Sequence, residues 1–228
     1  MNGFPQLHEV TKVLADKSRL DILTILMDNR FHTVSELARK VKLKSHTVSY
    51  HLKKLNEMEW VSYYKQGKNS YYKLTSDEVA HLLENMMNIS PIKEVNSLRK
   101  YEEYNKLKHG RTCYKHLAGV IGVDFLNNLI KYEYITLQMN AIHLSVKGEE
   151  FFENLGLDIA SIKKQSGEFI KPCLDWTERL FHLSGNLGKA FLNLCIDGGY
   201  ILQNSTDRSV TLSKDGEEFF SKLFAESA

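Results

Sequence analysis

Two segments in the second half of the chain carry side chains that could bind a metal ion or react as thiols. Each holds one cysteine and one histidine: Cys113 and His116 in the first, Cys173 and His182 in the second. A three-residue spacing would place Cys113 and His116 close together if they lay on a helix. Two thiolates and two imidazoles would then suit Zn²⁺ or another thiophilic ion.

Two other roles are open for these residues. Arg111 and Lys115 could lower the pKa of Cys113 and make it a redox sensor, so that Cys113 and Cys173 act as a thiol or metal sensor. Alternatively the cysteines are buried and the histidines bond to the backbone, which is the commonest fate of a free cysteine and the interpretation we favour. No cofactor is expected beyond the possible metal ion.

Trp176 follows Cys173 in the second segment and also has two interpretations. Its indole could line a pocket for an organic effector, or it could anchor the two C-terminal repeats to each other, which is the more common role. The chain has no glycine-rich phosphate loop, no Gly-x-Ser-x-Gly elbow and no His-Glu-x-x-His pair. We therefore expect that the protein is not an enzyme.

Residues 33–60 predict two short helices joined by a tight turn. Thr33 and Glu36 form a capping-box pattern at the start of the first helix. After the turn at 42–44, Ser45 is the expected N-cap of a second helix over 45–59. Its apolar residues recur at helical spacing and predict a buried stripe: Val48, Leu52, Leu55 and Met58.

The opposite face of the second helix carries hydrogen-bonding and cationic side chains. The candidate DNA contacts on and around it are Lys44, Ser45, His46, Thr47, Ser49, Tyr50, Lys53 and Lys54. Six cations and no acid occur between positions 39 and 54. A major groove admits such a helix, and phosphates attract the cations, so we expect double-stranded DNA as the partner. A solvated surface helix is the alternative.

A basic aromatic hairpin follows directly. The strand-like runs 61–65 and 69–74 flank Gln66-Gly67-Lys68. Lys65 and Lys68 lie near its tip and could contact phosphate, whereas the tyrosines are expected to pack across the strands. The hairpin completes the pattern of a winged helix.

These elements resemble the ArsR family of winged helix-turn-helix transcriptional repressors. The resemblance covers residues 7–89 and rests on 15–26, 36–38, 47–55 and 71–74. It implies a homodimer that binds a palindromic operator, with the first and last helices of the domain at the interface. The apolar residues available there are Leu7, Val10, Val13, Leu14, Val79, Leu82, Leu83, Met86 and Met87, which could equally form intramolecular core. The cysteines with which some members sense metals are replaced by Val-Ser-Glu-Leu-Ala at 34–38.

The C-terminal half contains an internal duplication. Residues 116–129 align with 182–195 at an offset of 66, and 144–152 align with 212–220 at an offset of 68. Each copy predicts helix, strand, turn, strand and helix, the closing half of a winged helix; the first helix is expected over about 117–132. The segments around Cys113 and Cys173 also resemble motifs of a long ArsR-like subgroup, which implies no particular ligand.

The expected fold is therefore mainly α with short β-hairpins, in three parts. Residues 1–89 form a winged helix-turn-helix domain, 90–110 a charged helical linker, and 111–228 a C-terminal domain of two winged-helix-like repeats at about 112–157 and 173–224. Residues 1–74 hold 13 Lys and Arg against 7 Asp and Glu, although the whole chain has a net charge of only +2. The positive charge is thus concentrated at the DNA-binding end.

Composition also bounds the setting in which the protein works. Three cysteines without a framework spacing fit a reducing compartment. The sequence shows neither a long apolar run nor a signal-peptide pattern, so we expect a cytoplasmic protein without a membrane partner. The regulatory ligand is expected to be a small-molecule or metal effector of unknown identity.

Overall fold

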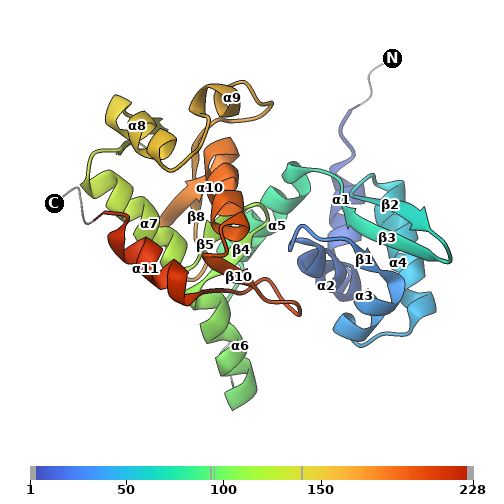
Figure 1. Ribbon diagram of the computed structural model, residues 1–228. Helices are drawn as coiled ribbons and strands as arrows, with labels where there is room; N and C mark the ends of the chain where they lie inside the picture. The colour runs from blue at the N-terminus through green and yellow to red at the C-terminus, as the bar shows by residue number, and fades with distance from the viewer. Residues whose placement is uncertain (1–3, 93, 95, 140, 225–228) are drawn as a thin grey trace. The chain divides into compact units, whose positions relative to one another are not determined.

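The computed structural model describes residues 4–92, 94, 96–139 and 141–224. It divides the chain into two compact units, Met1–Met86 and Met87–Ala228. Figure 1 colours the first unit blue to cyan and the second green to red. Among the described residues, no helix combines the length and hydropathy needed to cross a membrane.

The first unit is built from five helices among its described residues. They are α1 (Leu7–Leu14), α2 (Lys17–Leu26), α3 (Val34–Val41), α4 (Ser45–Glu57) and α5 (Asp77–Ile89), whose last turn extends beyond Met86. Asp16 caps α2 by accepting a hydrogen bond from the backbone N–H of Arg19. The predicted capping box of α3 is present, because Thr33 accepts from the N–H of Glu36 and Glu36 accepts from the N–H of Thr33.

The turn between α3 and α4 corrects one expectation. Lys42 ends α3 in the left-handed region, with φ of 57°. The sequence suggested Ser45 as the N-cap of the next helix, but α4 begins at Ser45 and Lys44 holds the N-cap position without a side-chain hydrogen bond. The hydroxyl of Ser45 therefore lies on the first turn, where it is exposed to solvent.

A three-stranded antiparallel sheet completes the first unit. Its strands are β1 (His32–Thr33), β2 (Val61–Gln66) and β3 (Asn69–Leu74), in the order β1-β3-β2. The β2–β3 hairpin is the predicted wing, and Gly67 takes the positive φ that its two-residue loop requires. Buried aliphatic side chains join α2, α3, α4 and β2 into a core: Ile22, Leu23, Leu26, Leu37, Val48, Leu52, Leu55 and Val61.

The second unit begins with α6 (Leu98–His109), which lies in the segment expected as a charged linker. It has no buried residue of its own, yet it contacts β4, α7 and β11 of the same unit. The first repeat then contains β4 (Arg111–Cys113), β5 (His116–Ala118), α7 (Val120–Lys131), β6 (Ile135–Gln138), β7 (Ala141–Leu144) and α8 (Val146–Asn154).

The second repeat has the same order of elements and follows the short helix α9 (Ile159–Lys163). It consists of β8 (Lys171–Leu174), β9 (Phe181–Ser184), α10 (Gly185–Asp197), β10 (Ile201–Gln203), β11 (Val210–Leu212) and α11 (Lys214–Lys222). Each repeat is therefore hairpin, helix, hairpin, helix (Figure 1). The last three of these elements, helix, hairpin and helix, are the arrangement that the duplication predicted for each repeat.

The first hairpin of each repeat was not expected. The helix anticipated over about 117–132 begins only at Val120, because Leu117 and Ala118 belong to β5. Gly119 separates strand from helix with φ of +77°, a conformation that a side chain would strain. A Cβ there would also lie 2.6 Å from the carbonyl oxygen of Lys108.

Equivalent residues of the two repeats meet each other, as they do across a two-fold axis. The rings of Phe125 and Phe191, which the 66-residue offset pairs, stack with centroids 3.9 Å apart and planes 6° apart. Both repeats contribute to one core, which contains Leu126, Leu129 and Phe152 from the first and Leu187, Leu192 and Cys195 from the second. Neither repeat would bury its apolar surface alone.

Candidate nucleic-acid interface and a buried cysteine and histidine cluster

The polar face of α4 is turned to solvent. Six of its eight candidate residues are exposed and the other two, Thr47 and Lys54, are partly buried; the exposed ones are Lys44, Ser45, His46, Ser49, Tyr50 and Lys53. Tyr50 is 57% exposed. A helix that presents hydroxyls, a phenol and ammonium groups in this way has the donors and acceptors that base edges and phosphates require.

The opposite face of α4 fixes the helix on the first unit. Val48, Leu52 and Leu55 are fully buried, as their spacing predicted. His51 is also buried, at 7% exposure, which the apolar pattern did not foresee because histidine is not an apolar residue type. The buried stripe determines which residues of α4 remain outside.

The wing has the arrangement that its sequence predicted. Lys65 and Lys68 are exposed at its tip. The tyrosines pair across the strands: Tyr63 with Tyr72 at a centroid distance of 5.3 Å, and Tyr64 with Tyr71 at 5.1 Å. Their rings therefore stiffen the hairpin that carries the two lysines.

In the second unit, the four metal-type side chains come together from the first hairpins of the two repeats. Cys113 lies directly opposite His116 in the β4–β5 register, and Cys173 lies opposite His182 in the β8–β9 register. The expectation that Cys113 and His116 share a helix was wrong, since each stands on its own strand. One ligand atom from each of the four residues lies within 4.8 Å of all the others. We call these four residues the Cys/His cluster.

The Cys/His cluster is enclosed by protein. Cys113, His116 and His182 are at most 4% exposed, and Cys173 is partly buried. The two sulfur atoms lie 3.9 Å apart, well beyond the disulfide bond length of about 2.05 Å. The rings of His116 and His182 stack with centroids 5.0 Å apart.

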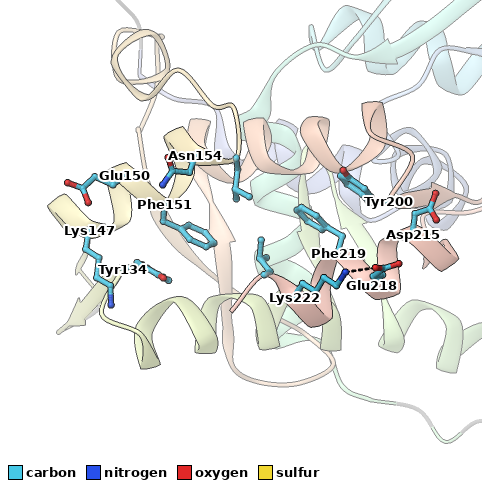
Figure 2. Close-up of a pocket in the computed structure, with 12 residues that line it drawn as sticks. Tyr134, Lys147, Glu150, Phe151, Asn154, Tyr200, Asp215, Glu218, Phe219 and Lys222 are labelled. Carbon is cyan, nitrogen blue, oxygen red and sulfur yellow. Dashed lines mark hydrogen bonds and ion pairs between the residues drawn. The ribbon is translucent and has the colours of Figure 1, made fainter. Parts of the chain in front are cut away.

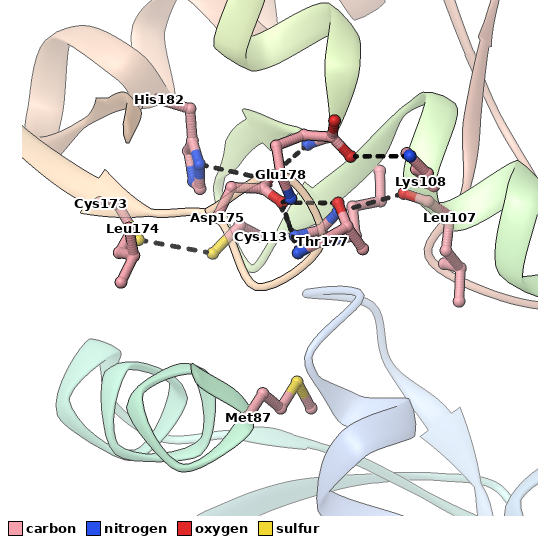
Figure 3. Close-up of polar contacts among 12 residues, drawn as sticks. Met87, Leu107, Lys108, Cys113, Cys173, Leu174, Asp175, Thr177, Glu178 and His182 are labelled. Carbon is pink, nitrogen blue, oxygen red and sulfur yellow. Dashed lines mark hydrogen bonds and ion pairs between the residues drawn. The ribbon is translucent and has the colours of Figure 1, made fainter. Parts of the chain in front are cut away.

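Asp175 adjoins this cluster and organises the loop between β8 and β9 (Figure 3). Its Oδ2 atom lies 2.9 Å from Nη2 of Arg111 and 3.4 Å from Nδ1 of His182, and it accepts a 2.7 Å hydrogen bond from the N–H of Gly119. Its Oδ1 atom accepts from the backbone and hydroxyl of Thr177. Burial raises the pKa of Asp175, but His182, Arg111 and these hydrogen bonds outweigh it and hold the pKa well below its usual range.

Arg111 is committed to this network. Its guanidinium pairs with Asp175, donates to the carbonyl oxygen of Leu107 and lies 4.6 Å from the ring centroid of Trp176. The guanidinium of Arg111, which the sequence suggested as a cation that activates Cys113, forms an ion pair with Asp175. Trp176 packs against Arg111, so its ring contacts a residue of the other repeat. The Asp-x-Thr spacing at 175–177, typical of an Asx turn, was the one sequence signal for Asp175.

The cysteines differ in their chemical surroundings. The hydrogen bond with Cys113, together with contacts to His116 and His182, lowers the pKa of Cys173 strongly. Burial lowers the pKa of His182, but Asp175 and Cys173 outweigh it and raise that pKa to about 9. Burial alone raises the pKa of Cys195 in α10 to about 12. Cys195 is fully buried in the core.

A cleft of about 690 Å³ opens elsewhere on the second unit, between α8 and α11 (Figure 2). Two stacked ring pairs line it, one from each repeat: Tyr134 with Phe151 at 4.4 Å and Tyr200 with Phe219 at 4.2 Å. Charged side chains at its rim include Lys147, Glu150 and Lys222. Trp176, for which an effector pocket was one of two alternatives, does not line this cleft.

Comparison with known proteins gives consistent matches. A family model described as "Bacterial regulatory protein, arsR family" matches residues 16–63. A chain of Bacillus subtilis (strain 168), described as "Uncharacterized HTH-type transcriptional regulator YdfF", is 33% identical over 218 residues, 96% of both chains. The transcriptional activator HlyU of Vibrio cholerae is 34% identical over 73 residues, 32% of this chain and 67% of that protein. The solved structure of reduced HlyU from Vibrio cholerae N16961 matches with a TM-score of 0.34 and 29% identity, covering 38% of this chain and 90% of that one.

The first unit, with an exposed polar helix after a tight turn and a basic hairpin behind it, is a winged helix-turn-helix, the fold of DNA-binding transcriptional regulators. The similarity to an HTH-type regulator extends over both units. The chain belongs to the ArsR family of bacterial transcriptional regulators.

Proposed function

We propose that the protein is a dimeric repressor that inserts α4 in the major groove of a palindromic operator. The observation that carries this proposal is the two-sided character of α4, with an apolar face buried in the unit and a polar, cationic face exposed. Lys65 and Lys68 of the wing contact the flanking phosphates. The protein acts in the cytoplasm, where a bacterial regulator meets its DNA.

Dimer formation through the first and last helices of the winged-helix domain accounts for apolar side chains left outside. Leu7 of α1 is 71% exposed and Ile89 of α5 is 85% exposed. Part of the predicted interface stripe belongs instead to the core of the chain, because Val13, Val79 and Leu83 are buried without a partner chain. The interface therefore centres on the outer residues of the two helices.

In this proposal, residues 1–89 bind DNA, 90–110 connect the domains and 111–228 respond to an effector. The repeats are those expected at about 112–157 and 173–224. The effector is a small molecule or a metal ion, and its binding changes operator affinity. The alternative is a winged-helix module that binds a partner protein and does not bind DNA.

Charge reversal on α4 tests the proposal. Genomic DNA fragments selected with the purified protein would supply the operator, and fluorescence anisotropy would measure affinity. Lys53→Glu with Lys54→Glu should abolish binding, because two phosphate-facing cations become repelling anions. The control is Lys163→Glu with Lys164→Glu, an adjacent pair of exposed lysines in the second unit, which should retain binding.

Salt dependence separates the proposal from its alternative. A dimer that neutralises on the order of ten phosphates should lose about 10³-fold or more in affinity between roughly 50 and 200 mM salt. A weak, salt-insensitive response to duplex DNA, unchanged by the two glutamates on α4, would favour the protein-interaction module. A reporter gene behind the selected fragment then distinguishes repression from activation.

A further inference from the structure

We infer that Cys113, His116, Cys173 and His182 bind one zinc ion in a closed tetrahedral site that joins the two repeats of the second unit. The inference does not depend on DNA binding, because all four residues lie within the second unit. It replaces the role in simple packing that the sequence favoured for these side chains.

The separation of the ligand atoms fits a zinc ion. With Zn–S bonds of about 2.3 Å, two sulfurs on a tetrahedron lie about 3.8 Å apart. The sulfurs of Cys113 and Cys173 are 3.9 Å apart, and the four ligand atoms lie within 4.8 Å of one another. Two thiolates with two imidazoles are a common ligand set of structural zinc sites.

The backbone holds these ligands without help from the ion. Directly opposite residues on antiparallel strands have Cβ atoms about 4.5–5.5 Å apart, so each hairpin presents its cysteine and histidine as a ready pair. The two-fold relation of the repeats then brings the pairs together. A Cβ on Gly122 of α7 would lie 3.6 Å from Cβ of His182, and one on Gly188 of α10 would lie 3.4 Å from Cβ of His116. Each repeat thus packs its helix against the other repeat's histidine.

Asp175 supplies the outer support that metal-bound histidines usually have. Its carboxylate faces Nδ1 of His182 at 3.4 Å, which leaves Nε2 to bind the ion. A carboxylate that accepts a hydrogen bond from the second ring nitrogen of a metal-bound histidine fixes the orientation of the ring and increases its basicity. His182 is fully buried and its Nε2 atom makes no hydrogen bond to the described residues, so coordination would satisfy a buried polar atom that is costly to leave unpaired.

The character of the site indicates a structural ion. All four ligands come from protein and are largely shielded, which leaves no open position for a water or a substrate. The ion would link β4–β5 to β8–β9 and reinforce the packing of one repeat on the other. Loss of the ion should therefore loosen the second unit and leave the winged helix folded.

Metal analysis of the full-length protein tests the inference. After purification with zinc and removal of free metal, elemental analysis should find one zinc per chain. Substitution by Co²⁺ should give strong visible ligand-field bands and a sulfur-to-cobalt charge-transfer band, the signature of a tetrahedral thiolate site. Cys113→Ala and Cys173→Ala should each lose the ion. The matched control is Cys195→Ala, which removes a buried cysteine outside the Cys/His cluster and should still bind one zinc ion per chain.

Measurements on the unmodified chain make the test independent of whether the variants fold. A chelator should lower the melting temperature of the second unit, and added Zn²⁺ should restore it. The inference fails if the reduced wild-type protein binds no zinc, if the double variant of Cys113 and Cys173 still binds one ion, or if the cobalt spectrum is octahedral. A Cys113–Cys173 disulfide in a protein that takes up no metal after reduction would indicate a redox pair instead.

Discussion

Arg111 lies 2.9 Å from Asp175, and neither side chain is exposed to solvent. The two residues come from different repeats, so the ion pair spans the contact between them. Removing two charges from water costs free energy, which only good geometry and additional hydrogen bonds offset. Here Gly119, Thr177 and Leu107 provide those bonds.

Breaking this pair should destabilise the second unit. Asp175→Ala leaves the Arg111 guanidinium buried without its carboxylate, which should cost about 3–5 kcal/mol in free energy of unfolding. The chain has two tryptophans, Trp60 and Trp176. In a Trp60→Phe background, tryptophan fluorescence during urea unfolding therefore reports on the second unit. Lys108→Ala removes the partly exposed Lys108–Glu178 pair and should cost at most about 1 kcal/mol. Equal costs for the two variants would show that the buried pair has no special weight.

The capping box of α3 makes a prediction about pH. The hydrogen bond from the Thr33 backbone lowers the pKa of Glu36 below its ordinary value of 4.5. A carboxyl whose pKa is lowered in the folded state stabilises the helix at pH values above its ordinary pKa. That contribution is lost as the pH falls through the pKa of the folded state. Glu36→Gln should therefore flatten the acid side of the stability profile of α3, measured by hydrogen exchange on peptides that cover it.

Thr33 makes the other half of the same capping box. Thr33→Ala should cost about 1 kcal/mol at neutral pH, because the N–H of Glu36 loses its acceptor. The loss should appear as faster exchange over residues 34–41. If exchange in the second unit changed equally, the effect would not be one of local capping.

The proposed dimer interface can be broken by charge. Leu7→Glu with Val10→Glu places one carboxylate at an exposed position of α1 and one at a partly buried position, where desolvation on association would be costly. Light scattering should then report a monomer, and operator affinity should fall. Leu202→Glu, at a comparably exposed leucine of the second unit, should leave mass and affinity unchanged. A dimer that persists in the α1 variant would place the interface elsewhere.

Cys195 should be chemically inert in the folded protein. Burial raises the pKa of its thiol to about 12, so almost no reactive thiolate is present near neutral pH. Mass spectrometry after treatment with iodoacetamide should find Cys195 unmodified in the native protein and alkylated in urea. Alkylation at the same rate in both conditions would mean that α10 opens readily.

Local sequence signals were sufficient for most of the first unit. The capping box, the helix stripes and the wing hairpin depend on hydrogen bonds and contacts between residues near in sequence, and the structure contains each of them. Ser45 and His51 are exceptions: Lys44 holds the N-cap position that Ser45 was expected to hold, and His51 is buried although its residue type is not apolar. The duplication was also visible, since similar sequences fold into similar elements.

The assembly of the Cys/His cluster was decided only by tertiary structure. Three-residue strands such as β4 and β5 are too short to show an alternating pattern, so the sequence could not separate them from the start of a helix. Cys113 and Cys173 are 60 positions apart, whereas the aligned histidines are 66 apart, because the loop after β8 is longer and carries Asp175. The four side chains come together through strand pairing within each repeat and core packing between the repeats. Both act between residues far apart in sequence, so no local pattern encodes them.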